Sequence, residues 1–245
     1  MHRFFAPALD LGDEFVALPR EEGEHLTRVL RLGVGDQVSV FDGRGHEFVA
    51  RVATVVRRDV RLQLQSRIEA AAEPTVAITL APAVVKGDKM DDIVRDAVML
   101  GVTAIQPLVS HRTEITVAAL MRSARVDRWR RVALASVKQS RRAVLPDIRT
   151  PLTVEAFLDD PPAAMRLMLV EPAAEGGESI AALQREPTPP DAAVLVGPEG
   201  GWAEQERDLA RERRVRLVTL GPRTLRADAV PVAAISVLQF LWNDL

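Results

Sequence analysis

Residues 195–245 read LVGPEGGWAEQERDLARERRVRLVTLGPRTLRADAVPVAAISVLQFLWNDL, and this stretch decides the fold. Two apolar runs end in glycine-proline turns: Ala192–Val196 leads into Gly197–Gly201, and Val215–Leu220 leads into Gly221–Pro222. Short apolar runs that stop at such turns are typical of buried parallel strands. The highly charged segment between the turns suits an exposed helix face. Strand, turn and helix in this order predict an α/β sheet, whose ligands bind beyond the carboxyl ends of its strands, where both turns lie.

The first turn, Gly197-Pro198-Glu199-Gly200-Gly201, has the composition of a ligand-binding loop. Glycine allows backbone to approach a ligand closely and adopts positive φ without a clash. Proline fixes φ, so the loop holds its shape before a ligand arrives. Backbone N–H and C=O groups in such a loop can bind the polar edges of an adenine or an amino-acid group. Two tight turns without a ligand are the alternative, and spacing alone does not separate the two.

Composition predicts a soluble globular protein. Hydrophobic residues make up 47% of the chain and charged residues 27%, which is ordinary for that class. The chain has no cysteine, which excludes disulfides, thiolate chemistry and cysteine-bound zinc, and its 4 histidines show no metal-ligand spacing. The first residues lack the apolar core of a signal peptide, and no apolar run reaches the length of a membrane span. We therefore expect a cytoplasmic protein with neither a metal nor a membrane partner.

Positive charge is concentrated between residues 122 and 149. This segment contains eight arginines and one lysine against two aspartates, an excess of seven positive charges in a chain whose net charge is -2. Arginine and lysine clustered in this way can neutralise nucleic-acid phosphates. A solvated helix face is the alternative, because most charge runs have that role.

Residues 1–72 are predicted to form a small β-barrel with one helix. Apolar and polar residues alternate in short segments, as they do in half-buried strands. The expected strands cover residues 3–5, 14–18, 36–41, 47–56 and 60–66. The helix, residues 21–32, carries Arg28 and Arg31 beside its apolar face, where they either contact phosphate or only keep the helix soluble. A linker at residues 69–74 ends this region at a proline.

Strand and helix patterns alternate after the linker. Further strands are expected at residues 75–85, 102–109 and 166–170. One helix is expected from Asp88, as its N-cap, to Gly101, and a long one from Leu120 to Arg142. Residues 229–242 are apolar almost all round, which predicts a helix that is buried in the core or at a subunit interface. Asp228 stands where it could be the N-cap of this last helix.

Taken together, these segments resemble the RsmE family. The resemblance rests on GPEGG, LGPRTLR and the apolar C-terminal helix, on the opening HRFF, and on residues 25–45, 86–113 and 138–142. It covers nearly the whole chain, with the segments in the family's order. Members of this family are SPOUT methyltransferases. They use S-adenosylmethionine, with S-adenosylhomocysteine as product, to methylate N3 of a specific uridine in the 16S rRNA of the small ribosomal subunit.

The resemblance implies two domains and a homodimer. Residues 1–72 would form a PUA-like RNA-binding β-barrel domain. Residues 73–245 would form a SPOUT methyltransferase domain, an α/β domain that binds the cofactor, dimerises and contains a deep trefoil knot. Knots are rare in proteins, and no pattern in this sequence predicts one independently. The implied partners are 16S rRNA in the small ribosomal subunit and a second copy of the chain.

The resemblance also assigns residues to the site. Arg226 is expected to orient the uracil or stabilise its anion, and Arg142 to act beside it on the RNA; the alternative for Arg142 is stabilisation of a helix dipole. The residues expected to bind the cofactor are Leu169, Glu171, Val196, Gly197, Pro198, Glu199, Gly200, Gly201, Leu220, Gly221, Pro222, Leu225, Arg226 and Ala227. The residues expected to bind RNA are Arg3, Arg28, Arg31, Lys86, Lys89, Arg112, Arg141 and Arg142.

One departure from the family pattern keeps alternatives open. Where the family usually has Leu-Arg-Thr-Glu-Thr-Ala, residues 225–230 read Leu-Arg-Ala-Asp-Ala-Val, so two hydroxyls are lost and a carboxylate is one methylene shorter. The alternatives are a SPOUT methyltransferase with a different RNA target, such as a ribose 2′-hydroxyl, and a catalytically impaired rRNA-binding assembly factor. A dinucleotide-binding oxidoreductase is disfavoured, because no G-x-G-x-x-G follows the first strand. No motif identifies the general base.

Overall fold

The structure is a computed structural model that describes residues 1–159 and 163–244. Contacts between Cα atoms divide the chain into two compact units, which we call the N-terminal unit and the C-terminal unit. The N-terminal unit comprises Met1–Glu73 and Val137–Leu145, and the C-terminal unit comprises Pro74–Ser136 and Pro146–Leu245. No helix among the described residues is long and apolar enough to cross a membrane.

The N-terminal unit is built on a five-stranded sheet in the order β1-β3-β4-β5-β2. The strands are β1 (Arg3–Phe5), β2 (Phe15–Ala17), β3 (Gln37–Phe41), β4 (Glu47–Val56) and β5 (Asp59–Ile68). All pairs are antiparallel except β1 with β3. The predicted helix is present as α1 (Arg20–Glu24) followed by a π-helical turn η1 (His25–Val29). Alternate strand residues such as Val38, Val40 and Leu62 are buried with Leu26 from this turn.

The end of helix α4 (Arg125–Ser140) belongs to the N-terminal unit. The Arg3 guanidinium donates to the carbonyls of Val137 at 2.9 Å, Lys138 at 2.9 Å and Arg142 at 2.8 Å, and to the Glu47 carboxylate at 3.0 and 2.8 Å. The last carbonyls of a helix have no partner within the helix, so they need such a donor. Arg3 therefore ties the first strand to a segment more than 130 residues away in the chain.

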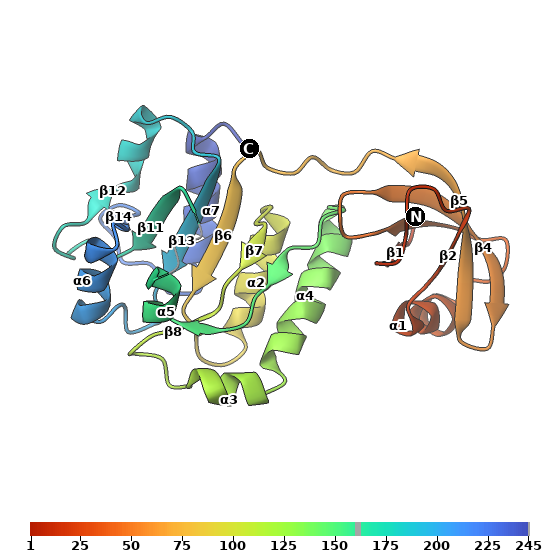
Figure 1. Ribbon diagram of the computed structural model, residues 1–245, viewed down its shortest axis with the longest axis horizontal. Coiled ribbons are helices and arrows are strands. Elements are labelled where there is room, and N and C mark those ends of the chain that lie inside the picture. Colours follow the sequence, from red (N-terminus) through yellow and green to blue (C-terminus); the bar gives the residue numbers. More distant parts are fainter. Residues whose placement is uncertain (160–162, 245) are drawn as a thin grey trace. The chain divides into compact units, whose positions relative to one another are not determined.

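The C-terminal unit contains a seven-stranded parallel sheet in the order β12-β14-β11-β13-β6-β7-β9 (Figure 1). Its strands are β6 (Ala77–Pro82), β7 (Ala104–Ile105), β9 (Asp147–Ile148), β11 (Met165–Leu169), β12 (Glu178–Ser179), β13 (Asp191–Val196) and β14 (Arg216–Thr219). A separate pair joins β8 (Leu108–Val109) and β10 (Leu152–Thr153). The predicted α/β class with a parallel sheet is confirmed.

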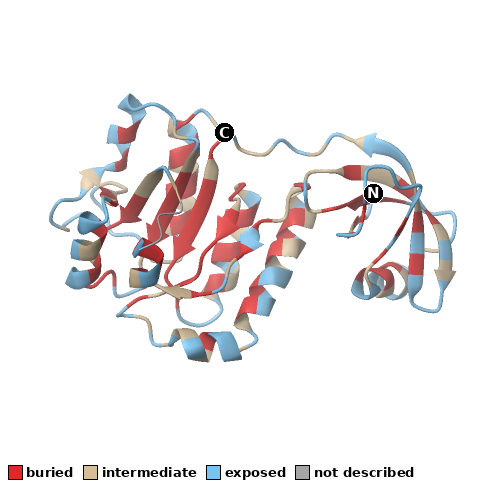
Figure 2. Ribbon diagram, in the orientation of Figure 1, coloured by how far each residue is buried: buried red, intermediate tan, exposed pale blue. Residues whose placement is uncertain are grey.

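Helices cover both faces of this sheet, which explains why its strands are apolar throughout. The helices of this unit are α2 (Lys89–Met99), α3 (Val117–Arg122), most of α4, α5 (Val154–Asp159), the 3-10 helix η2 (Ile180–Arg185), α6 (Glu204–Glu212) and α7 (Val230–Leu241). Met168 and Leu195 point to the face on which Phe157 of α5 and Ala210 of α6 pack. Helices α2 and α7, which contact each other, lie on the other side (Figure 1). The central strands are accordingly buried along their length (Figure 2).

The structure departs from the predicted long helix and from the predicted capping bond of α2. The expected single helix from Leu120 to Arg142 is two helices, α3 and α4, because Ser123 is extended, with φ -86° and ψ 162°. The Ser123 hydroxyl accepts from the backbone N–H of Arg125 at 3.3 Å, so it satisfies a donor at the start of α4. Asp88 stands at the N-cap position of α2, but its side chain makes no cap hydrogen bond and pairs with Arg128 at 3.1 Å.

Candidate functional site

A cavity of about 220 Å³ lies at the carboxyl ends of β14, β11 and β13, three neighbouring strands of the parallel sheet. Its walls come from the segments that follow these strands, within residues 169–172, 196–202 and 220–227. Lys89 of α2 and Val230 of α7 complete the lining. The cavity therefore lies where an open parallel sheet binds its ligands.

Most of the residues predicted to bind the cofactor line this cavity. They are Leu169, Glu171, Val196, Gly197, Pro198, Glu199, Gly201, Leu220, Leu225, Arg226 and Ala227. Gly200, Gly221 and Pro222 lie in the same turns but are not part of the lining. That any of these residues binds a cofactor stays a prediction, because a lining does not identify its occupant.

Further lining residues were not predicted for the cofactor. They are Lys89, Val170, Pro172, Trp202, Arg223, Thr224 and Val230. Five of them are direct neighbours of predicted residues in the sequence, so wider bounds on each turn would have included them. Val230 starts the apolar helix that the sequence does predict. Lys89 was expected to bind RNA, and no signal in the sequence places it at these turns.

Two glycines of the loop at residues 197–203, which we call the glycine loop, are closely surrounded: a side chain at Gly201 would clash, and one at Gly197 would require Trp202 to shift. Gly201 has φ +69°, and a Cβ there would lie 1.9 Å from Oε1 of Glu171. A Cβ on Gly197 would lie 3.2 Å from the indole of Trp202. The indole N–H donates to the carbonyl of Leu169 at 2.9 Å, which joins the loop to the end of β11. Backbone, rather than side chains, therefore forms this wall of the cavity.

Charged side chains of both signs surround the cavity. Arg226 is 73% exposed, and its guanidinium donates to both carboxylate oxygens of Asp228 at 3.2 Å. Lys89 Nζ lies 3.8 Å from the same carboxylate. Limited burial opposes ionisation of Asp228, but a hydrogen bond from its own backbone and the charges of Arg226 and Lys89 outweigh it and lower its pKa. The expected N-cap role of Asp228 is wrong, because α7 has Ala229 at its N-cap position and no side-chain cap.

The glycine loop is hydrogen-bonded to two other loops of the C-terminal unit. Oε1 of Glu199 accepts from the backbone N–H of Lys86 at 3.0 Å. The guanidinium of Arg112 donates to the carbonyl of Gly200. Arg112 belongs to residues 110–113, which we call the SHRT loop, directly after β8. Three loops that follow strands of the C-terminal unit are thus held together around the cavity.

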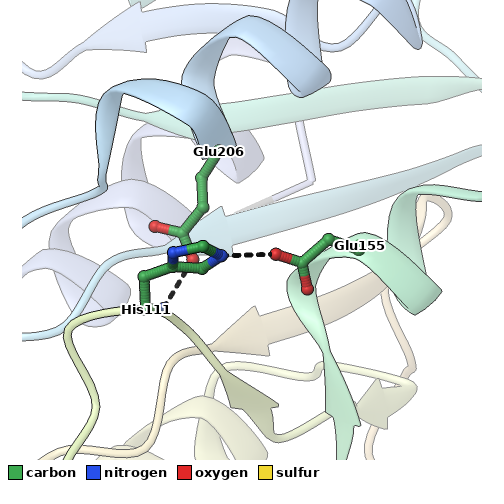
Figure 3. A group of neighbouring side chains, drawn as sticks. All are labelled: His111, Glu155 and Glu206. Atoms are coloured by element: carbon green, nitrogen blue, oxygen red, sulfur yellow. Dashed lines mark hydrogen bonds and ion pairs between the residues drawn. The ribbon is translucent and has the colours of Figure 1, made fainter.

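His111, Glu155 and Glu206 form a hydrogen-bonded group beside the glycine loop (Figure 3). His111 Nε2 lies 2.9 Å from Oε1 of Glu155, and its backbone N–H donates to Oε1 of Glu206 at 2.9 Å. Burial opposes ionisation of Glu155, but hydrogen bonds from its own backbone, Thr153 and His111 outweigh it and lower its pKa. One ligand atom from each of the three residues falls within 4.8 Å of the others, a grouping that could hold a metal ion. Its members lie too far apart in the sequence for spacing to reveal it.

The residues predicted to bind RNA differ in their exposure to solvent and in their side-chain partners. Arg28, Arg31, Lys86, Arg112 and Arg141 are exposed. Lys86 pairs with Glu114 at 2.6 Å, and this carboxylate raises the pKa of the Lys86 ammonium.

Arg142 is only 4% exposed and donates to both oxygens of Glu73, at 3.1 and 3.0 Å from its Nε. Arg3 is held by Glu47 and by the end of α4. Contact of any of these residues with RNA stays a prediction, and for Arg3 and Arg142 it would require their buried contacts to open.

Comparison with known families identifies both parts of the chain. The family model of an RNA methyltransferase domain matches residues 72–239. The family model of an RNA methyltransferase PUA domain matches residues 18–65. Together the two family models cover the chain except for short stretches at its ends and between the two matches.

Curated proteins and a solved structure resemble the chain over almost its whole length. The ribosomal RNA small subunit methyltransferase E of Synechocystis is 32% identical, over 94% of this chain and 74% of that protein. The protein of the same name from Mycobacterium bovis is also 32% identical, over 98% of this chain and 93% of its own. The crystal structure of the Neisseria gonorrhoeae ribosomal RNA small subunit methyltransferase E, bound to S-adenosyl methionine, has a TM-score of 0.86 at 31% identity. It covers 99% of this chain and 98% of that one.

Proposed function

Because the chain belongs to the ribosomal RNA small subunit methyltransferase E family, we propose that it methylates N3 of a uridine in the 16S rRNA of the small ribosomal subunit, with S-adenosylmethionine as methyl donor. The observation that carries this proposal is the cavity at the ends of β14, β11 and β13, which the GPEGG and LGPRTLR turns line. Those turns are also the residues on which the resemblance to the family rests.

The residues of the cavity fit S-adenosylmethionine. The glycine loop presents backbone that no side chain obstructs at Gly197 and Gly201, as a flat adenine requires. Leu169, Val196 and Leu225 supply apolar wall. Carboxylates and cations at the edge of the cavity can pair with the ammonium and carboxylate of the amino-acid part. When bound there, the cofactor would supply an activated methyl group on a sulfonium.

The chain's own contribution is alignment and electrostatics. N3 lies on the Watson–Crick edge of uracil, so the base must be unpaired or extruded before it can enter a pocket. The N3–H is a weak acid, and a proton must leave as the new bond forms. Arg226, at the cavity edge, is proposed to hold O2 or O4 of the uracil and to stabilise the N3 anion. The proton acceptor is not assigned.

A methyl-transfer assay tests the function. Small ribosomal subunits lacking the modification would be incubated with the protein and labelled S-adenosylmethionine, then digested, and the nucleosides identified by mass spectrometry. We expect 3-methyluridine. Another methylated nucleoside would retain the enzyme class and change the target. No transfer, together with no binding of S-adenosylhomocysteine, would favour the assembly-factor alternative that the Ala227-Asp228 departure keeps open.

Replacing Arg226 by alanine tests the proposed catalytic residue. The guanidinium is mostly exposed, so its loss should leave the fold intact. We expect kcat to fall by about 100-fold or more, the range found when one donor to a developing anion is removed. Binding of S-adenosylhomocysteine, followed by calorimetry, should change little. An Arg226→Ala protein that binds cofactor and methylates at the normal rate would contradict the assignment.

The wider architecture of the family is proposed for this chain too. We propose a PUA-like RNA-binding domain in residues 1–72, a dimerising SPOUT domain with a trefoil knot in residues 73–245, and a cytoplasmic location. Support for the homodimer comes from Phe240 on α7, a large apolar residue that is 68% exposed. Light scattering would measure the mass in solution, and a monomeric mass at micromolar concentration would contradict the dimer.

A further inference from the structure

We propose that Glu206 is a positioning residue: it holds the glycine loop in the shape that binds the cofactor by joining that loop to the SHRT loop. This inference rests on the proposed function, since it concerns how the same cavity holds S-adenosylmethionine. Glu206 is 1% exposed and is not part of the cavity lining. Glu206 therefore does not touch a ligand in the cavity, and its direct contacts are with the backbone that it holds.

Both carboxylate oxygens of Glu206 accept hydrogen bonds from backbone N–H groups. Oε2 accepts from Ala203 at 2.8 Å and Oε1 accepts from His111 at 2.9 Å; Figure 3 shows the second bond. Ala203 is the N-cap residue of α6 and has no side-chain oxygen, so of the two bonds of a capping box only the one from its backbone N–H to Glu206, the third helical residue, is made. Hydrogen bonds to a carboxylate are among the stronger ones in proteins, and its charge is favourable at a helix N-terminus.

The SHRT loop, which Glu206 contacts through the backbone of His111, is itself hydrogen-bonded. Within the loop, the backbone N–H of Thr113 donates to the carbonyl of Ser110 at 3.1 Å, and the two hydroxyl oxygens are 3.1 Å apart. The imidazole of His111 is held by Glu155 of α5 at 2.9 Å. The SHRT loop is thus held in shape by its internal bonds and is joined to α5 through His111.

Other contacts hold the middle of the glycine loop and the side chain of Trp202, whereas Glu206 holds the backbone of its last residue. Lys86 holds the side chain of Glu199, and Arg112 holds the carbonyl of Gly200. Trp202 lines the cavity and is followed directly by Ala203, the residue that Glu206 holds. The position of Trp202 is therefore set from two sides, by the bond of its indole to Leu169 and by the bond between Glu206 and Ala203.

The contacts of Glu206 fit a link between two loops better than they fit a metal ligand in the group of His111, Glu155 and Glu206. Backbone N–H groups direct the positive ends of their dipoles at both oxygens of Glu206. A cation among the same oxygens would be repelled by those dipoles. An anion that joins two loops is consistent with every contact that Glu206 makes in the described residues.

The test is Glu206→Gln, which keeps the shape of the side chain but loses the charge and one of the two acceptors. Binding of S-adenosylhomocysteine is measured by calorimetry, and hydrogen exchange of the peptide spanning residues 197–203 is followed by mass spectrometry. We expect Kd to rise about tenfold, because a loop that is no longer preorganised must be ordered on binding. Exchange of the loop should be faster without ligand and return towards the normal rate when ligand is saturating.

Steady-state kinetics separate positioning from simple loss of stability. If Glu206 positions the loop, the KM for S-adenosylmethionine rises while kcat at saturating cofactor stays close to normal. If it only supports the fold, the active fraction falls, so kcat falls and KM does not change. The second result, or a Kd within a factor of two of the normal protein, would overturn the inference.

Two further variants keep the result interpretable. Glu212→Gln removes an exposed carboxylate from the other end of α6 and should leave Kd unchanged. Ala203→Ser combined with Glu206→Gln provides a hydroxyl at the N-cap position but does not restore the bond to His111. We expect this double variant to recover thermal stability and to retain the weak binding; recovery of both would overturn the link to the SHRT loop. If the normal protein fails to bind S-adenosylhomocysteine, the proposed function fails instead.

Discussion

At the scale of the residue, Gly201 makes the strictest demand on the sequence. Its φ of +69° is one that residues with a side chain rarely adopt, and a Cβ would fall 1.9 Å from the Glu171 carboxylate. Gly200 next to it has no positive φ, and a Cβ there would meet only the Arg112 side chain at 3.4 Å. Two adjacent glycines of the same turn therefore have different reasons to be glycine.

Alanine at each position tests this difference. For Gly201→Ala we expect binding of S-adenosylhomocysteine to weaken by more than tenfold and stability to fall by more than about 1 kcal/mol, since both the backbone and Glu171 must move. Gly200→Ala should lose far less in both measurements. Calorimetry and urea unfolding of the two proteins provide the comparison. Equal losses would mean that the conformation of Gly201 is not what the loop requires.

The sequence predicts which residues surround the cavity better than it predicts how they are held. Glycine and proline mark turns by local chemistry alone, so Gly197–Gly201 and Leu220–Ala227 could be found without a structure. The partner of Arg142 could not, because Glu73 lies 69 residues earlier and charges of both signs are common throughout the chain. Glu206 is hidden for the same reason: it reads as one more acid on a charged helix, yet it is buried.

At the scale of the element, strands and helix ends are predicted well where turn residues mark them directly. Each apolar run before a glycine-proline turn is a parallel strand, and Gly101 ends α2 with φ +93°. The break between α3 and α4 was missed, because Ser123 is an acceptable helix residue and its capping role depends on the direction of the next helix.

Asp244 joins the segment after α7 to the segment before β6. Its carboxylate accepts from the backbone N–H of Thr75 at 2.8 Å, from that of Val76 at 3.0 Å and from the Thr75 hydroxyl at 3.0 Å. Partial burial opposes ionisation, but these bonds outweigh it and lower the pKa of Asp244 below its ordinary value. A carboxylate with a lowered pKa stabilises the fold above its unfolded-state pKa of about 3.9, and this contribution is lost as pH falls through the folded-state pKa.

Asp244→Asn should therefore destabilise the protein in a pH-dependent way. We expect a loss of about 1 kcal/mol at pH 7, because hydrogen bonds to a charged group are replaced by weaker neutral ones at a partly exposed site. The difference from the normal protein should shrink as the pH is lowered below about 4. Urea unfolding at several pH values measures both. Asp127→Asn, whose carboxylate is 70% exposed, is the control and should show a smaller loss at pH 7. An Asp244→Asn deficit that is constant from pH 7 to pH 3 would contradict the assigned role of the charge.

At the scale of the whole molecule, the linker at residues 69–74 is not the only place where the chain passes from one compact unit to the other. Residues 137–145 belong with Met1–Glu73, although more than sixty residues of the C-terminal unit lie between them in the sequence. Composition marks the linker clearly, but no local pattern reveals that the end of α4 completes the N-terminal unit. Contacts between distant segments depend on the assembled fold, and a single sequence does not carry them.

A fragment of residues 1–73 should consequently be much less stable than the same residues in the full chain. It lacks the three carbonyls that accept from Arg3, the Arg142 guanidinium that pairs with Glu73, and the Lys138 ammonium that pairs with Glu22. The side chains of Glu73 and Lys138 are 27% and 25% exposed, so these pairs are only partly buried. Each hydrogen bond to a charged group contributes about 1.5–3 kcal/mol, and the lost bonds together are a large share of the stability of so small a domain. Hydrogen exchange of the β3 and β4 amides, compared between the fragment and the full chain, measures the loss. Joining residues 137–145 to the fragment by a flexible linker should restore much of the protection. Equal protection in the fragment without them would show that residues 1–73 fold independently of α4.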